Sequence, residues 1–262
     1  MITEKMYVKQ YRVPALAGLA LLGLAACGGG DNNTPPLTGG IRVANGIVDS
    51  TGLGMSITAT TSFSAIAVDS ASTISYIPIS AVVSYSATLT TNGSSFKVGG
   101  ISADQDKVTT VFAFGEMGSG TQGGFPAEMS LNPASNGESV VQPVHAALLT
   151  AATALSLNFY FVKPGVCSTA IPDATANGSA TFKASPAPFP LAGGTYEICV
   201  TDASGTVLFD SGPTGVALPT SNANVFQIAA YDAPSGTGNG SGLVLSLLDN
   251  AGGNTVLYNL KN

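Results

Sequence analysis

The stretch LSLNFYFV at residues 155–162 decides the fold of this chain. Large apolar side chains at positions 155, 157, 159 and 161 alternate with Ser156, Asn158 and Tyr160. A period of two places the apolar side chains on one face of an extended strand, whereas a helix would scatter them around its axis. The stretch therefore predicts a half-buried β-strand. It also argues against a membrane span over Ala146–Val162, an uncharged segment that contains several hydroxyl and amide side chains.

The same alternation occurs in other parts of the chain. It is found at residues 84–90, 108–114 and 196–201. In the second of these, Val108, Thr110, Phe112 and Phe114 form one apolar stripe. Asn-Gly, Ser-Gly and Gly-Gly pairs separate the runs and favour turns between antiparallel strands. With 45% hydrophobic and only 9% charged residues, the composition is that of a folded all-β protein rather than a disordered chain.

Four blocks of sequence recur in the same order in the two halves of the chain. Residues 41–44 recur as 143–146, 55–58 as 155–158, 84–93 as 195–205, and 108–116 as 224–232. The preserved order predicts a duplication, with a first module at 40–134, a second at 138–262, and a boundary near 133–137. The offset between the copies grows along the chain, which predicts an insertion in the second copy, chiefly Pro164–Leu191.

Each copy holds about seven candidate strands in roughly 100 residues, the size of an immunoglobulin-type sandwich. The sequence therefore predicts two tandem immunoglobulin-like antiparallel β-sandwich modules. The chain contains no tryptophan, so the Cys-Trp-Cys core of antibody domains is absent.

The N-terminus has the pattern of a lipoprotein leader. Lys5, Lys9 and Arg12 precede an apolar run that is too short to span a bilayer and ends in Leu-Ala-Ala-Cys at Cys27. We expect residues 1–26 to be a signal peptide, Cys27 to be the lipid attachment site, and 27–39 to be a flexible tether. The alternative is an ordinary secretory signal with an incidental cysteine. By resemblance to enterobacterial lipoproteins, Gly28 after the cysteine favours the outer membrane, with the modules periplasmic or surface-exposed.

Charge restricts the partners of the chain. The net charge is −6, and removal of residues 1–26 makes the chain more acidic and leaves Arg42 as its one arginine. Nucleic acids and anionic lipid surfaces require many cationic side chains to neutralise phosphates. We therefore expect no nucleic-acid partner and a membrane contact through the lipid anchor alone.

Cys167 and Cys199 are the cysteines that remain after Cys27. In an oxidising envelope such a pair most simply forms a disulfide, worth about 3–4 kcal/mol in the chain-entropy model. Because Cys199 alternates with Ile198 and Val200, we expect Cys167 to reach it on the outer face of the sheet, from the inserted loop. A metal site is the competing hypothesis, but no Cys-x-x-Cys spacing exists and His145 is distant in sequence.

The remaining motifs carry little chemistry. His145 lies in a predicted strand, where a packed or hydrogen-bonded histidine is the commoner role. The stretch Gly118–Gly123 matches a dinucleotide-binding glycine pattern, but Gly124, Phe125 and Pro126 follow it where a helix is needed, so a hairpin loop is expected. Asp104 and Asp106 offer two carboxylates, whereas calcium prefers six to eight oxygens, so a solvated turn is the better interpretation.

The second copy resembles the family named domain of unknown function 4397. The resemblance rests on Val144–Ala147, Leu155–Val162, Gly193–Thr201 and Gly205–Ser211, and it extends over roughly residues 40–250. The first copy departs from it, because Asn45-Gly46 replaces the expected motif. The resemblance implies an immunoglobulin-like sandwich in a bacterial envelope protein, and it supplies no catalytic residues.

The sequence as a whole predicts a lipid-anchored cell-envelope protein with a structural or binding role, no enzymatic activity and no cofactor or metal. A surface adhesin or glycan-binding module is the first alternative. A glycosidase that uses carboxylates such as Asp104, Asp106 or Asp210 is a remote one, since such enzymes need two acids facing each other across a cleft. The Pro164–Leu191 loop is the expected binding surface for a protein or glycan, because sandwiches place function on loops.

Overall fold

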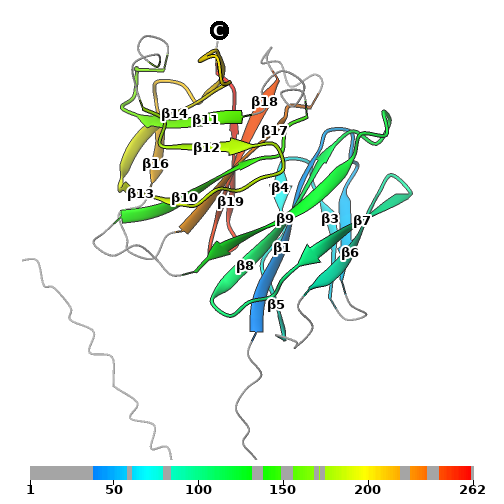
Figure 1. Ribbon diagram of the computed structural model, residues 1–262. Helices are drawn as coiled ribbons and strands as arrows, with labels where there is room; N and C mark the ends of the chain where they lie inside the picture. The colour runs from blue at the N-terminus through cyan, green and yellow to red at the C-terminus, as the bar shows by residue number, and fades with distance from the viewer. Residues whose placement is uncertain are drawn as a thin grey trace, which may run out of the picture. The chain divides into compact units, whose positions relative to one another are not determined.

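Strands arranged in four sheets make up the regular structure of the described residues (Figure 1). The structure is a computed structural model and describes residues 38–57, 61–78, 84–131, 138–148, 156–167, 171, 175–218, 225–234 and 242–260. The leader, Cys27, most of the tether and the 133–137 boundary lie outside them. Residues 38 and 39, assigned above to the tether, belong to the first strand. In the described part of the chain, no helix is long and apolar enough to cross a membrane.

The first half of the chain forms two sheets. One has the order β4-β1-β8-β9, with β5 also paired to β1, and the other has the order β3-β2-β6-β7. The strand bounds are β1 (Thr38–Ile47), β2 (Leu53–Ser56), β3 (Ser62–Ile66), β4 (Ser70–Ala71), β5 (Ser75–Pro78), β6 (Tyr85–Thr91), β7 (Ser94–Ile101), β8 (Lys107–Gly115) and β9 (Gly123–Ser130). Asn92 and Gly93 both have positive φ in the β6–β7 turn, as predicted for an Asn-Gly hairpin.

The second half forms two sheets with the orders β13-β10-β17-β18-β19 and β12-β11-β14-β15, with β16 also paired to β14. The strand bounds are β10 (Glu138–His145), β11 (Ser156–Val162), β12 (Gly178–Thr181), β13 (Phe189–Ala192), β14 (Gly194–Thr201), β15 (Val207–Asp210), β16 (Val216–Leu218), β17 (Val225–Asp232), β18 (Leu243–Asp249) and β19 (Asn254–Tyr258). The predicted strand at 155–162 is confirmed from Ser156 onward as β11.

The two halves share one strand order, which supports the predicted duplication. In the first half, β1 and β2 are inner strands of different sheets, and β1 pairs with β8, which follows the last strand of the other sheet in sequence. In the second half, β10 and β11 are likewise inner strands of different sheets, and β10 pairs with β17. Those central pairs, β1–β8 and β10–β17, are parallel, so the prediction of purely antiparallel sheets is wrong. Immunoglobulin constant domains place their first two strands in the same sheet. The sandwich architecture is therefore found, and the immunoglobulin-like topology is not confirmed.

The predicted insertion is shorter than expected. Residues 178–191 of the proposed Pro164–Leu191 loop contain β12 and all but the last residue of β13. These are regular strands of the second sandwich and correspond to β3 and β4/β5 of the first. The added length lies at 163–177 between β11 and β12, where the first half has only 57–61. Sequence offsets could not separate an insertion from strands of weak apolar pattern.

Each sandwich has its own apolar core, and a third apolar cluster joins the two. The first core contains Ile41, Val43 and Val111, and the second contains Phe159, Ile198 and Ile228. The joining cluster takes side chains from both halves: Ala44, Phe112, Phe114, Phe125, Ala127, Val144, Ala146, Ala229, Tyr231, Val244 and Leu248. Residues 36–262 accordingly form one compact unit.

The joining cluster corrects two sequence interpretations. Phe112 and Phe114 face the other half of the chain, whereas Val111 and Ala113, which alternate with them, face the sandwich core, so β8 is buried on both sides. Their counterparts in β17 are Ala229 and Tyr231, which also lie in the joining cluster. The alignment of 108–116 with 224–232 is therefore one residue out of register, because a shift of one residue exchanges the two faces of a strand.

Arg42 lies at the centre of the contact between the halves. Its side chain is fully buried and donates hydrogen bonds to Thr110 Oγ1 (2.8 Å), Gln227 Oε1 (3.0 Å) and the Asp249 carbonyl oxygen (2.6 Å). Burial lowers its pKa to about 10, against the opposing effects of Asp249 and Tyr231, so the guanidinium is still charged at neutral pH. Three directed bonds to groups of both halves fix how the two sandwiches pack.

Candidate functional site

The segment 163–177 is attached to the outer face of the β12-β11-β14-β15 sheet by the Cys167–Cys199 disulfide. The two Cα atoms are 5.9 Å apart, within the normal range for this bond. Tyr160, Cys167, Ile171 and Cys199 form a small buried cluster that is separate from the core on the opposite face. The prediction of a disulfide that joins a loop to the outer face of the sheet is confirmed. We call residues 163–177 the pinned loop.

Hydrogen bonds hold both ends of the pinned loop. Glu197 is 2% exposed, and its Oε2 accepts from the backbone N–H of Val166 (2.6 Å) and of Cys167 (2.9 Å). At the other end, Asn177 Oδ1 accepts from the Phe161 N–H (2.7 Å). The Asn177 N–H donates in turn to the Phe159 carbonyl oxygen (2.9 Å). The described ends of the loop, residues 163–167 and 175–177, are thus fixed to β11 and β14 by hydrogen bonds in addition to the disulfide.

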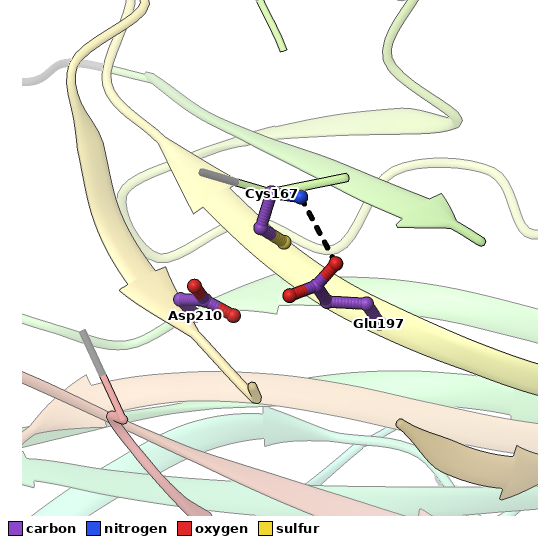
Figure 2. Close-up of side chains that lie close together, drawn as sticks. All are labelled: Cys167, Glu197 and Asp210. Atoms are coloured by element: carbon purple, nitrogen blue, oxygen red, sulfur yellow. Dashed lines mark hydrogen bonds between the residues drawn. The ribbon is translucent and has the colours of Figure 1, made fainter. Parts of the chain in front are cut away.

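Beside the disulfide, two carboxylates come together (Figure 2). One ligand atom each from Cys167, Glu197 and Asp210 lies within 4.8 Å of the others. The strand pattern explains this, because Glu197 and Cys199 are two residues apart on one face of β14, and Asp210 of β15 pairs directly with Cys199. Asp210 Oδ1 also accepts from the Gly212 N–H (2.7 Å). We call Cys167, Cys199, Glu197 and Asp210 the disulfide–carboxylate cluster.

Sequence reasoning missed Glu197 and misjudged Asp210. The signal for Glu197 was present, since the alternation that put Cys199 outside the core puts Glu197 there too. Asp210 was considered only as a possible acid catalyst, and the β14–β15 pairing alone brings it to the cysteines. Cys167 therefore has no further candidate ligand nearby in the sequence, but in the fold it lies beside two carboxylates.

His145 ends β10 and is fully buried. Its Nδ1 accepts a hydrogen bond from the Ala147 N–H (3.3 Å), and its ring meets Phe182 edge to face with centroids 5.5 Å apart. This is the packed, hydrogen-bonded role predicted for a strand histidine.

Asp104 and Asp106 lie in the turn before β8. Lys107 Nζ contacts Asp104 Oδ2 (2.9 Å) and Glu128 Oε2 (2.8 Å), and hydrogen bonds to Glu128 and then Asp104 raise the pKa of Lys107. Asp106 has positive φ, and its carbonyl oxygen accepts from the Leu131 N–H (2.7 Å). An ammonium group thus bridges Asp104 and Glu128 at this turn, which agrees with the predicted solvated turn.

The glycine-rich stretch Gly118–Gly123 connects β8 to β9, as expected for a hairpin loop. The Asp49 carboxylate accepts from the N–H groups of Met117 and Gly118, both at 2.8 Å. These N–H groups bind a side chain of the same module rather than facing outward toward a phosphate.

Comparison with known proteins adds little to this geometry. No family model matches the chain, so the resemblance to domain of unknown function 4397 has no independent support, and no curated protein matches it either. Among solved structures, the chain is similar to the Bacillus anthracis TIE protein at 9% identity and a TM-score of 0.21. That match covers 86% of this chain and 48% of the other, so this chain spans about half of the length of that protein.

Proposed function

We propose that this chain is a lipid-anchored cell-envelope protein with a structural or binding role, in which the two sandwiches present the pinned loop to a protein or glycan. The observation that carries the proposal is the Cys167–Cys199 disulfide across the outer face of a sheet. Structural disulfides form and persist in oxidising compartments outside the cytoplasm. A lipidated Cys27 would hold the modules in such a compartment.

The packing of the two halves suits this role. A binding loop gains affinity when it is ordered before its partner arrives, because less conformational entropy is then lost. The pinned loop has its Val166 and Cys167 N–H groups bound to Glu197, and the sheet below it belongs to a compact unit of both halves. The resemblance to a family of envelope proteins without a known activity agrees with this proposal.

The anchor is tested by fractionation of cells that express the full chain or its Cys27→Ser variant. We expect the unmodified chain in the membrane fraction with incorporated labelled fatty acid, and the variant in the soluble envelope fraction without label. A Cys27→Ser chain that stays in the membrane fraction would refute lipid anchoring. Protease treatment of intact and lysed cells then separates a surface-exposed orientation, in which the chain is degraded on intact cells, from a periplasmic one.

The binding role is tested with a charge reversal on the pinned loop. Lys163 is exposed at the start of the loop, and Lys97 is also exposed, on β7 of the other sandwich. We expect Lys163→Glu to weaken binding to immobilised envelope glycans or surface proteins, and Lys97→Glu to leave it unchanged. An equal loss of binding in both variants would indicate a non-specific charge effect. Unchanged binding in both would contradict a role of the pinned loop in binding.

A further inference from the structure

We propose that reduction of the Cys167–Cys199 disulfide converts the disulfide–carboxylate cluster into a binding site for a divalent cation of the zinc type. The cation would be held by two thiolates and two carboxylates. The inference goes beyond the proposed function and does not depend on lipid anchoring or on the partner of the pinned loop.

The geometry of the cluster already approaches that of such a site. Zinc binds thiolate sulfur at about 2.3 Å and carboxylate oxygen at about 2.0–2.2 Å, so tetrahedral ligand atoms lie roughly 3.5 Å apart. The ligand atoms of Cys167, Glu197 and Asp210 lie within 4.8 Å of one another, and the Cys199 sulfur is bonded to that of Cys167. The Cys167, Glu197 and Asp210 ligand atoms must therefore approach one another by up to about 1 Å, and the two sulfurs must move apart once their bond is broken. Because the backbone segments are already in place, no strand has to move to another position.

The orientation of Glu197 suits metal binding. Its Oε2 is held by the N–H groups of Val166 and Cys167, and Figure 2 shows its other oxygen directed toward Asp210 and the Cys167 sulfur. Hydrogen bonds of this kind orient a ligand and commonly accompany metal-binding carboxylates. Two carboxylates this close to each other repel when both are ionised, and a divalent cation between them removes that repulsion.

The disulfide determines whether the site exists. In the oxidised protein the two sulfurs share a bond and are poor ligands, whereas thiolates are strong ligands for zinc. A dithiol reductant transfers two electrons and two protons to the disulfide, which gives two thiols and leaves the reductant as its own disulfide. Binding of the cation then displaces the two thiol protons. Since Cys167 and Cys199 are both nearly fully buried, the reductant reaches them only when the pinned loop opens locally.

Cobalt titration of the full chain tests this proposal. The protein is reduced with a phosphine under anaerobic conditions, and Co²⁺ is added while the absorption spectrum is recorded. We expect one Co²⁺ per chain with thiolate-to-cobalt charge-transfer and tetrahedral d–d bands, both absent from the oxidised protein.

Variants of the cluster residues test which side chains are ligands. Cys167→Ser should abolish the charge-transfer signature of two thiolates. Glu197→Gln and Asp210→Asn should each weaken Co²⁺ binding by about tenfold or more, because each loses a charged ligand. Glu138→Gln, the same change on β10, is the matched control and should bind like the unmodified chain.

Circular dichroism recorded on the same samples covers the case in which reduction unfolds the chain. Recovery of the β-sheet signal on addition of Co²⁺ supports the proposal, because metal binding then stabilises the folded state. A reduced chain that is folded but shows no charge-transfer band overturns it, and so does an unfolded chain that Co²⁺ does not restore. Binding of equal strength in Glu197→Gln, Asp210→Asn and Glu138→Gln would also overturn it, since the carboxylates would then not be ligands.

Discussion

At the scale of single residues, Arg42 is a fully buried cation that bonds to groups of both halves of the chain. No carboxylate of the described residues lies at salt-bridge distance from it, and its charge is stabilised by hydrogen bonds to Thr110, Gln227 and the Asp249 carbonyl oxygen. Hydrogen bonds to a charged group contribute more than neutral ones, and loss of one partner leaves the others buried and unsatisfied. Arg42 therefore fixes the register between the two sandwiches.

Replacement of Arg42 by methionine tests this role. Arg42→Met keeps a long side chain but leaves the Thr110 hydroxyl and the Asp249 carbonyl oxygen without the guanidinium donor, whereas Gln227 Oε1 keeps its bond from Thr110 Oγ1. We expect a loss of about 2–4 kcal/mol in the free energy of unfolding. Urea denaturation measures it. Lys97→Met, an exposed cation on β7, is the control and should change stability by less than about 0.5 kcal/mol. A similar small effect for Arg42→Met would show that the hydrogen bonds are dispensable.

Asp69 is the second residue with an unusual environment. It is 5% exposed, its Oδ1 has no hydrogen-bond partner among the residues that the structure describes, and burial raises its pKa to about 6. The buried Tyr231 hydroxyl lacks a partner as well, and burial followed by the charge of Asp69 raises the pKa of Tyr231. Ionisation of Asp69 therefore lowers the free energy of unfolding.

The cost of Asp69 predicts a specific pH dependence. Its unfolded pKa is near 3.8 and its folded pKa near 6, so between these values the native state binds more protons and stability falls as pH rises. Above about pH 6 Asp69 is ionised in both states, and the free energy of unfolding is lower by up to about 3 kcal/mol than it would be without the raised pKa. We expect Asp69→Asn to gain up to that amount at about pH 8 and little at about pH 4 in urea denaturation. Asp106→Asn is the matched control, because Asp106 has the same positive φ and is exposed. A variant with the same gain at both pH values would contradict the pKa explanation.

At the scale of elements, the approach of β1 to β17 depends on a glycine. A Cβ atom at Gly46 would overlap the ring of Tyr231, whereas a Cβ at Gly99 of β7 would have only Ser86 Oγ near it, at 3.7 Å. Tyr231 packs in the joining cluster with Phe112, at 6.3 Å between ring centroids. The small residue in β1 therefore makes room for the largest aromatic side chain that β17 contributes.

Alanine substitution of the two glycines distinguishes the effect of a clash with Tyr231 from the effect of replacing a glycine in a strand. Gly46→Ala forces the Tyr231 ring or the strands apart, and we expect it to lower the free energy of unfolding by about 1–3 kcal/mol. Gly99→Ala should be neutral within about 0.5 kcal/mol. Thermal and urea unfolding measure both. Equal effects in the two variants would indicate that loss of glycine itself, and not contact with Tyr231, is responsible.

At the scale of the whole molecule, the central strands of each half are buried on both faces. β1, β8, β10 and β17 face a sandwich core on one side and the joining cluster on the other. A sandwich separated from its partner would expose these aromatic and aliphatic side chains to water. Apolar burial on this scale favours a single cooperative unit over two independent domains.

We therefore expect one unfolding transition for the protein. The calorimetric and van't Hoff enthalpies should agree for the unmodified chain, as they do for a two-state unit. The double variant Arg42→Met/Gly46→Ala weakens the joining cluster without touching either core, and it should show two separate transitions. Two transitions in the unmodified chain would mean that the halves unfold independently despite their buried contact.

The sequence by itself determined several of the strands and their repetition, although it assigned β12 and β13 to a loop. Alternation of apolar and polar residues is a local property, so it identified the strand at 156–162, the Asn92–Gly93 turn and the outward direction of Cys199. Order of the repeated blocks likewise predicted two sandwiches of one design. Strand alternation and turns depend on residues a few positions apart, which is the range over which backbone geometry couples neighbours, and the repeat is found by comparing such local patterns between the two halves.

Only the tertiary structure decided which faces meet. The parallel β1–β8 and β10–β17 pairs join strands far apart in sequence, and their burial on both sides hides the alternation that marks a half-exposed strand. Neither the contact of Arg42 with Gln227 nor that of Asp210 with the cysteines has a local sequence signal. Both contacts follow from the packing of complete sheets. The pattern of a strand indicates that one of its faces is buried, but it does not indicate which residues cover that face.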